Sequence, residues 1–290
     1  MKPLARFRNV VLAGGGNRCW WQAGFWNAVA EPGGLAPERI AAVSAGSSTA
    51  CMLVAGKTPE TLAYYDDITR RNPRNFYPGN WLKGERAFPH AAMYRTALLT
   101  ILDAEALKRL HAGPEIYVQV ARLPSWLGPR SGVLAGILAY QFDKKVRKAL
   151  HPKLGQRVGF RRDVFRVKDC QTPEQLADLI LASSCTPPFT PVLRLHGQVA
   201  LDGGMVDNVP VGALDHAPGG RRGPTLVLLS RRYGRSLPAN EEFHYVQPSR
   251  PVPIKGWDYT NPAGVRAAYD LGVADGEAFL ADMLRNGAQR

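Results

Sequence analysis

The chain has 290 residues, and its 37 Lys and Arg exceed its 24 Asp and Glu, for a net charge of +13. With no internal repeat and no low-complexity linker, we expect one continuous domain over residues 1–290. The four cysteines are scattered without a C-x-x-C pair, which speaks against a disulfide framework or a metal site. The first apolar stretch is too short for a signal peptide, and no window reaches the ~20 apolar residues of a membrane span. We therefore expect a cytoplasmic protein that could touch a membrane only peripherally.

The positive charge is concentrated in one stretch. Residues 121–170 hold twelve Lys and Arg against three Asp and Glu. Such a patch attracts phosphates, either of nucleic acid or of anionic lipid, although an ordinary solvated face explains it equally well. The stretch carries no recognisable nucleic-acid module and no aromatic stacking motif, so we expect no nucleic-acid partner. Peripheral contact with an anionic membrane stays open, and so does the oligomeric state.

Hydrophobic periodicity predicts the elements of the first quarter of the chain. We expect a buried strand over 8–13, a helix over 20–30, and a loop rich in Pro and Gly up to Pro37. A strand over 39–43, a helix over 47–55 and a helix over 58–69 follow. This repeated order of strand, turn and helix is typical of a parallel sheet with crossover helices, and therefore of an α/β protein.

The remaining elements are predicted less regularly. Residues 71–90 combine Pro and Gly with Phe76, Tyr77 and Trp81, which favours a cap over a site or core. We expect strands over 116–123 and 225–230, a helix over 173–183, and insertions around 71–90 and 124–160. A segment over 133–150 is apolar at first and basic at its end, as in a surface helix docked on its own core or one lying on a membrane. A closing helix over 263–284 places five apolar side chains on one face: Val265, Tyr269, Val273, Leu280 and Leu284.

A glycine run follows the first predicted strand. Gly14, Gly15, Gly16 and, after Asn17, Arg18 lie at the carboxyl edge of the expected sheet, where ligands bind. Their backbone N–H groups could stabilise negative charge on an oxygen, and Arg18 could hold the loop through backbone carbonyls. A dinucleotide loop is disfavoured, because the third glycine of G-x-G-x-x-G is replaced by Cys19.

Ser44 follows the second predicted strand, at the turn into a helix. Its neighbours Ala42, Ala45 and Gly46 are small, as a nucleophile elbow requires where strand and helix approach closely. A serine at this place could also be a helix cap. The glycine run about thirty residues upstream favours the catalytic interpretation, because both turns would meet at one edge of the sheet.

Two routes could supply a base to Ser44. A triad in the order of the α/β-hydrolases would use a late histidine, and His196, His216 and His244 are the candidates. The alternative is Asp202, which follows an apolar strand and precedes two glycines that force a sharp turn. An aspartate is a weak base unless it is partly desolvated, so we expect partial burial of Asp202. A simple turn aspartate is the competing explanation.

Together these motifs resemble the patatin-like phospholipase family of serine acyl hydrolases with a Ser-Asp dyad. The matching pieces are the glycine run to Arg18, the elbow at Ser44, and Asp202 with its two glycines; residues 182–189 and 208–211 also look like the family. The chain departs from the pattern at Ala13, Cys19 and Ala42. None of these departures removes a reacting group.

The resemblance implies a three-layer α/β/α fold with a mostly parallel central sheet, and no metal or organic cofactor. It implies Ser44 as the nucleophile, Asp202 as the base, and the loop of Gly14, Gly15, Gly16 and Arg18 as the oxyanion hole. The expected function is a lipid acyl hydrolase, of phospholipase A or lysophospholipase type, acting on a lipid or other acyl ester. An acyltransferase or a non-catalytic lipid-binding protein on the same fold is the alternative.

Overall fold

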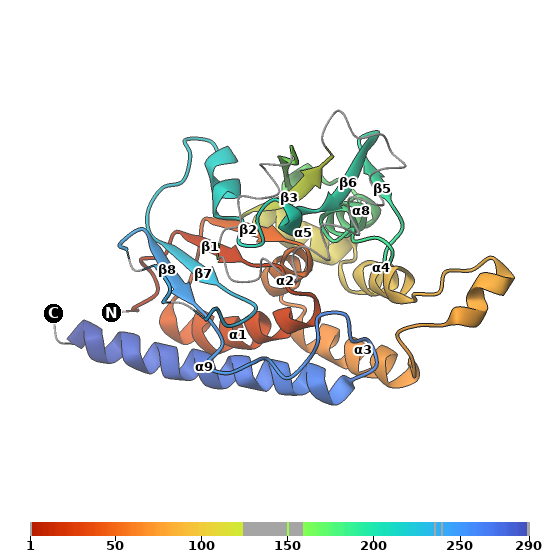
Figure 1. Ribbon diagram of the computed structural model, residues 1–290. Coiled ribbons are helices and arrows are strands. Elements are labelled where there is room, and N and C mark those ends of the chain that lie inside the picture. Colours follow the sequence, from red (N-terminus) through yellow and green to blue (C-terminus); the bar gives the residue numbers. More distant parts are fainter. Residues whose placement is uncertain (1, 124–149, 151–158, 235, 239, 289–290) are drawn as a thin grey trace.

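The computed structural model describes residues 2–123, 150, 159–234, 236–238 and 240–288 (Figure 1). Its α-helices are α1 (Trp20–Gly33), α2 (Ala45–Val54), α3 (Thr58–Arg71), α4 (His90–Ile101), α5 (Ala104–Ala112), α8 (Pro173–Ser183) and α9 (Pro262–Ala288). Short 3-10 turns lie between them: η1 (Gly16–Cys19), η2 (Pro78–Lys83), η3 (Val167–Asp169), η4 (Gly203–Met205) and η5 (Val211–His216). The predicted segment over 133–150, and with it most of the predicted insertion over 124–160, falls outside the described residues.

The described strands form one mixed, mostly parallel sheet in the order β5-β6-β3-β2-β1-β7-β8, with β4 paired to β3. The parallel pairs join β1 (Asn9–Leu12), β2 (Arg39–Val43), β3 (Glu115–Arg122), β7 (Thr225–Leu228) and β8 (Phe243–Val246). The antiparallel pairs join β3 to β4 (Arg161–Arg166) and to β6 (Gln198–Asp202), and β6 to β5 (Leu193–Leu195). The carboxyl ends of β1 and β2 therefore meet at one edge, as expected for parallel neighbours.

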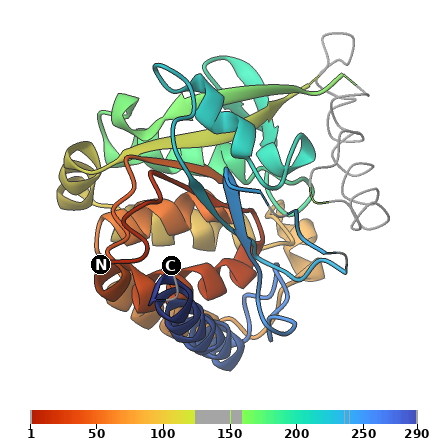
Figure 2. The same cartoon turned by 90° about the vertical axis from the view of Figure 1, so that its left-hand side faces the viewer.

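The two faces of the sheet carry separate layers. Along β1, Val10 and Leu12 face a large core built with α1, α2, α8 and α9, whereas Val11 and Ala13 face a smaller core that includes η5. This alternation follows from the two-residue period of a strand. Figure 1 shows α1 and α9 on one side of the sheet, and Figure 2 looks nearly along α9 where it lies against α1. The three-layer α/β/α prediction is confirmed.

Most of the predicted elements are found, and some of their ends differ. β2 and α8 match their predicted ranges, and the 71–90 segment is irregular apart from η2. Helix α1 continues through Pro32 to Gly33, two residues that we expected in a loop. It ends there because the next residue, Gly34, adopts the left-handed conformation, with φ 71°, and caps the helix. α2 begins at Ala45, two residues before its predicted start. Four elements were not predicted: α4, α5, β4 and β8.

Helix α9 packs along α1 at very short range. Gly24 of α1 faces the carbonyl of Tyr269, and Gly272 of α9 faces the carbonyl of Trp21, so closely that a Cβ atom at either glycine would overlap that backbone. The Trp21 indole donates a hydrogen bond to Asp275 Oδ2 at 2.7 Å across the same contact. We predicted that Leu284 belongs to the apolar face of this helix, but Leu284 is 51% exposed, so the prediction is wrong at this residue.

We predict that Gly272→Ala destabilises the protein, because the added methyl must push α9 away from α1. Overpacking of this kind costs roughly 1–3 kcal/mol, which exceeds the helix propensity of about 1 kcal/mol that alanine gains over glycine. Thermal or urea unfolding measures the change. Gly79→Ala is the matched control, because a Cβ there meets nothing within 4 Å. Equal stabilities of the two variants would contradict the close packing.

Candidate active site

Ser44 lies between the end of β2 and the start of α2 in a strained backbone conformation. Its φ of 55° and ψ of −136° are unusual for a residue with a side chain. The turn needs a glycine two residues later, because a Cβ at Gly46 would lie 2.6 Å from the carbonyl oxygen of Leu12. The small residues around Ser44 are thus explained by the close approach of α2 to β1.

Asp202 lies at the end of β6 and meets Ser44 directly. Ser44 Oγ donates a hydrogen bond to Asp202 Oδ2 at 2.6 Å. The other carboxylate oxygen, Oδ1, accepts from the backbone N–H of Gly204 at 2.7 Å. Ser44 is 8% exposed, and Asp202 is half-buried, as we expected for an aspartate beside the nucleophile. The two predicted residues are therefore in contact.

Strand β3 sets the distance between these residues. Val43 pairs with Gln119 on β3, and Asp202 pairs with the next residue, Val120. Gly203 then turns the chain against β3, where a Cβ would lie 2.7 Å from the Val43 side chain and would overlap the Gln119 carbonyl. A glycine after Asp202 is therefore required both by the close packing against β3 and by the turn itself.

Two buried polar side chains support Ser44 and the turn after Asp202: Ser183, noted from the sequence only as part of residues 182–189, and Gln119, which was not singled out. Ser183 Oγ accepts from the Ser44 N–H at 2.8 Å and donates to the Gln119 carbonyl at 2.7 Å. The Gln119 amide in turn donates to the carbonyls of Gly203 and Asp207 at 2.9 and 2.7 Å. A glutamine between Val118 and Val120 in a fully buried strand is the sequence signal that could have identified this network.

The first glycine of the run is engaged within the fold. The Gly14 N–H donates to the carbonyl of Asn208 at 3.1 Å. The Gly14 carbonyl accepts from Asn208 Nδ2 at 2.9 Å and from Ser230 Oγ at 2.6 Å. This differs from the expectation that all three glycines offer their N–H groups to an oxyanion, because one of the three already has a partner.

Of the next two glycines, Gly16 lines the pocket beside Ser44. Gly16 has φ 57°, and a Cβ there would overlap the carbonyl of Gly256. Arg18 Nε donates to the Gly15 carbonyl at 3.2 Å, which is the supporting bond expected of this arginine. The Asn17 N–H donates to the Gly256 carbonyl at 2.9 Å. The glycine loop is therefore held in place by its contacts with the chain segment at Gly256, which precedes α9.

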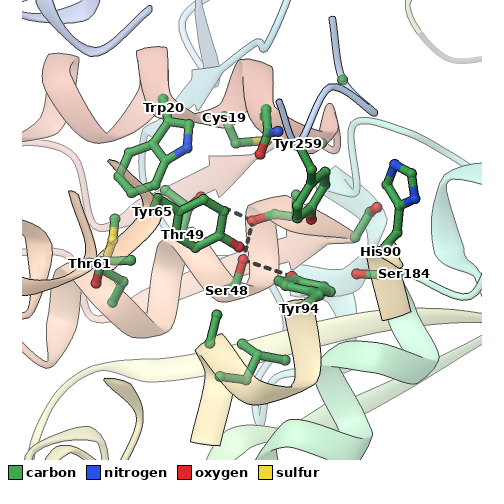
Figure 3. A pocket seen from close by; sticks show the side chains of 18 of the residues that line it. Cys19, Trp20, Ser48, Thr49, Thr61, Tyr65, His90, Tyr94, Ser184 and Tyr259 are labelled. Carbon is green, nitrogen blue, oxygen red and sulfur yellow. Dashed lines mark hydrogen bonds between the residues drawn. The ribbon is translucent and has the colours of Figure 1, made fainter. Parts of the chain in front are cut away.

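An apolar pocket opens beside Ser44 (Figure 3). It runs among α1, α2, α3 and α4 and is closed by residues 256–259. Its apolar lining consists of Trp20, Met52, Ala97, Leu98, Ile101, Leu102 and Trp257. Polar groups also reach it, and those labelled in Figure 3 include Ser48, Tyr65, Tyr94, Ser184 and Tyr259. The pocket has the shape and composition of a site for an apolar chain next to a serine.

Burial disfavours the charged forms of the ionisable groups in this pocket. It raises the pKa of the Cys19 thiol and of the Tyr259 hydroxyl, each to about 12. It lowers the pKa of His90, whose Nε2 lies 2.9 Å from the Trp257 carbonyl. At neutral pH Cys19 is therefore a thiol and not a competing nucleophile, since the thiolate is the reactive form.

The three late histidines lie away from the pocket. His196 is in the turn between β5 and β6 and packs against Phe165, and His216 is in η5. His244 in β8 packs between Phe7 and Phe279. The one described histidine that lines the pocket is His90, which the sequence did not single out. Within the described residues, the partner of the Ser44 hydroxyl is thus a carboxylate.

No group of three or more His, Cys, Asp and Glu side chains among the described residues could hold a metal ion. Over the same residues, no helix combines the length and the apolar character needed to cross a membrane.

Comparison with known proteins gives the family. A search of the curated proteins finds no match. Among solved structures, VipD from Legionella pneumophila is similar at 13% identity and a TM-score of 0.46, over 94% of this chain and 67% of that chain. The family model described as patatin-like phospholipase matches residues 10–215. Since this match spans well over half of the chain, the protein belongs to the patatin-like phospholipase family, and its general function is that of a lipid hydrolase.

Proposed function

We propose that the protein is a serine acyl-ester hydrolase in which Ser44 is the nucleophile and Asp202 the general base. The observation that carries this proposal is the 2.6 Å hydrogen bond from Ser44 Oγ to Asp202 Oδ2 at the end of an apolar pocket. A nucleophile within hydrogen-bond reach of its base is the arrangement that activates a serine. The strained elbow adds support, because strain of this kind concentrates at functional sites.

The reaction would proceed in two halves. Ser44 Oγ attacks the ester carbonyl carbon while its proton passes to Asp202, and the resulting tetrahedral oxyanion collapses as the alcohol leaves with that proton. Water then attacks the acyl-serine and gives a proton to Asp202. That proton returns to Ser44 Oγ as the acid is released. The N–H groups of Gly15 and Gly16 are proposed as the oxyanion donors, with Gly14 and Arg18 holding their loop.

The pocket favours a lipid substrate over a small ester. Burial of each methylene group gains about 0.8 kcal/mol, so an alkyl chain binds well among Met52, Leu98 and Ile101. The residues that line the pocket carry no charge at neutral pH whose hydration such a chain would remove. Transfer of the acyl group to an acceptor alcohol, or lipid binding without catalysis, is the second candidate on the same fold.

We predict that Ser44→Ala and Asp202→Asn each lower hydrolysis of a p-nitrophenyl ester by at least about a thousandfold, because each removes one half of the dyad. A fluorophosphonate probe should label the wild type and fail to label Ser44→Ala. The matched controls are Ser236→Ala and Asp270→Asn, which alter exposed side chains. Full activity of either dyad variant would contradict this assignment. A wild type that the probe does not label would favour the non-catalytic lipid-binding protein.

We predict that Gly16→Ala lowers kcat by about a hundredfold or more, since the added methyl would overlap the Gly256 carbonyl and displace the proposed oxyanion donors. Gly84→Ala is the matched control. Gly84 also has a positive φ, 72°, but a Cβ there meets nothing within 4 Å. Both variants suffer the same kind of backbone strain, so an equal loss of kcat in the two would exclude a role for the Gly16 loop in the reaction.

A peripheral membrane contact is proposed for the segment over 71–90. The segment projects from the rest of the fold beyond α3 (Figure 1), and Leu82, in η2, is 94% exposed. Phe76 is 44% exposed, and four exposed basic residues lie in the same segment: Arg71, Arg74, Lys83 and Arg86. Apolar side chains between basic ones suit an anionic lipid surface.

We predict that Leu82→Asp weakens binding to vesicles of anionic phospholipid, measured by cosedimentation, while hydrolysis of a dissolved ester is unchanged. Leu284→Asp introduces the same charge at an exposed leucine of α9 and should bind vesicles like the wild type. Equal binding by the two variants would exclude this segment as the membrane contact.

A further inference from the structure

The acyl pocket contains a cluster of hydroxyl groups that hydrolysis itself does not require. Ser48 and Tyr94 contribute to it from α2 and α4, and Tyr65, Ser184 and Tyr259 lie around them (Figure 3). All five line the same pocket as Ser44. Hydroxyls are costly beside a plain alkyl chain, because the chain removes their water without replacing its hydrogen bonds.

The tyrosine hydroxyls of the cluster differ in their hydrogen bonds from Ser48 and from the nearby threonines. Thr49 and Thr61 donate to carbonyls of their own helices at 3.0 and 2.5 Å, so their donors are used locally. Tyr94, in contrast, donates across the pocket wall to Ser48 Oγ at 2.8 Å. Tyr65 and Tyr259 hydrogen-bond to each other through their hydroxyls. The cluster therefore links different helices at the pocket surface.

Ser48 is the member best placed to meet a ligand. Its side chain is half-buried, donates to the Ala45 carbonyl at 2.9 Å and accepts from Tyr94. A hydroxyl oxygen has two lone pairs, so Ser48 Oγ can accept a second hydrogen bond besides the one from Tyr94. The complementary ligand group at this position is therefore a donor, such as a hydroxyl.

Helix α2 places this acceptor between the nucleophile and the apolar part of the pocket. Ser48 and Met52 lie four and eight residues after Ser44, about 6 and 12 Å along the helix at 1.5 Å per residue. Leu98 and Ile101 follow Tyr94 on α4, Leu102 comes directly after the helix, and all three are apolar and line the pocket. An acyl chain on Ser44 that follows α2 would pass the cluster before its tail reaches Met52.

We propose that this pocket selects acyl esters whose chain carries a hydroxyl group between the ester carbonyl and an apolar tail. The inference rests on the proposed function, since it assumes that the acyl chain of the acyl-serine occupies the pocket. The hydroxyl of the chain donates to Ser48 Oγ and replaces the water that the chain displaces. A plain chain of equal length lacks this bond, and sites built to hydrogen-bond a substrate group discriminate against analogues without it.

The test compares glycerol monoesters of octanoic acid with those of hydroxyoctanoic acids that carry the hydroxyl at different positions. Released acid is measured by chromatography. We expect at least one hydroxylated ester to exceed the plain ester in kcat/KM by about tenfold, which corresponds to about 1.4 kcal/mol. The ratio should fall toward one in Ser48→Ala, which removes the accepting oxygen, and should persist in Tyr94→Phe, which keeps the ring and leaves the Ser48 acceptor in place. Because the ratio is internal to each variant, a change in overall rate does not affect it.

Tyr64→Phe is the matched control, because Tyr64 is a half-buried tyrosine of α3 outside the pocket lining and its loss should leave the ratio unchanged. Equal rates for the plain and all hydroxylated esters in the wild type would overturn the inference and identify the cluster as a link between helices. Hydrolysis of p-nitrophenyl acetate and fluorophosphonate labelling test the proposed function separately. If the wild type hydrolyses the acetate but shows no preference for hydroxylated esters, only this inference is contradicted. If it neither hydrolyses the acetate nor reacts with the probe, the proposed function is contradicted.

Discussion

The contact between Ser44 and Asp202 joins parts of the chain that are 158 residues apart, and the surrounding fold is arranged around it. Strand β3 lies beside both partners, in parallel with β2 and antiparallel to β6. Because Val43 and Asp202 pair with consecutive residues of β3, the register of this strand fixes how far apart the hydroxyl and the carboxylate lie. A shift by one residue would turn the side chains to the other face of the sheet.

Small residues are required wherever another segment approaches this contact. Gly46 lets α2 approach β1, and Gly203 lets the chain after Asp202 approach β3. The buried side chains of Ser183 and Gln119 then satisfy backbone groups that the tight turns leave exposed to the interior. Such groups need partners because an unpaired polar group inside a protein costs about 1–3 kcal/mol. The elbow at Ser44 is thus held by packing and by hydrogen bonds together.

The pocket combines an apolar interior with groups that burial keeps neutral. Desolvation disfavours the charged form of every group, so it raises the pKa of Cys19 and Tyr259 and lowers the pKa of His90. Ser44 lines the pocket, and its partner Asp202 is half-buried, so that water can reach the carboxylate. This separation suits a reaction in which an apolar chain is sequestered while the second half of the cycle uses water.

The sequence by itself determined the α/β class, most of the elements and the candidate residues, because strand and helix periods and glycine-flanked turns are local patterns. Helix α4 and strands β4 and β8 were missed, since their residues lack a clear period and are specified by neighbours distant in the chain. Helix α5 was also missed, although its buried Ala106, Leu107 and Leu110 have helical spacing. Only the tertiary structure decided that Gly14 donates to Asn208, that Ser183 and Gln119 support Ser44, and that hydroxyls of α2 and α4 meet in the pocket. Each of these is a contact between distant segments, and its geometry depends on strand register and helix packing, which no local pattern encodes.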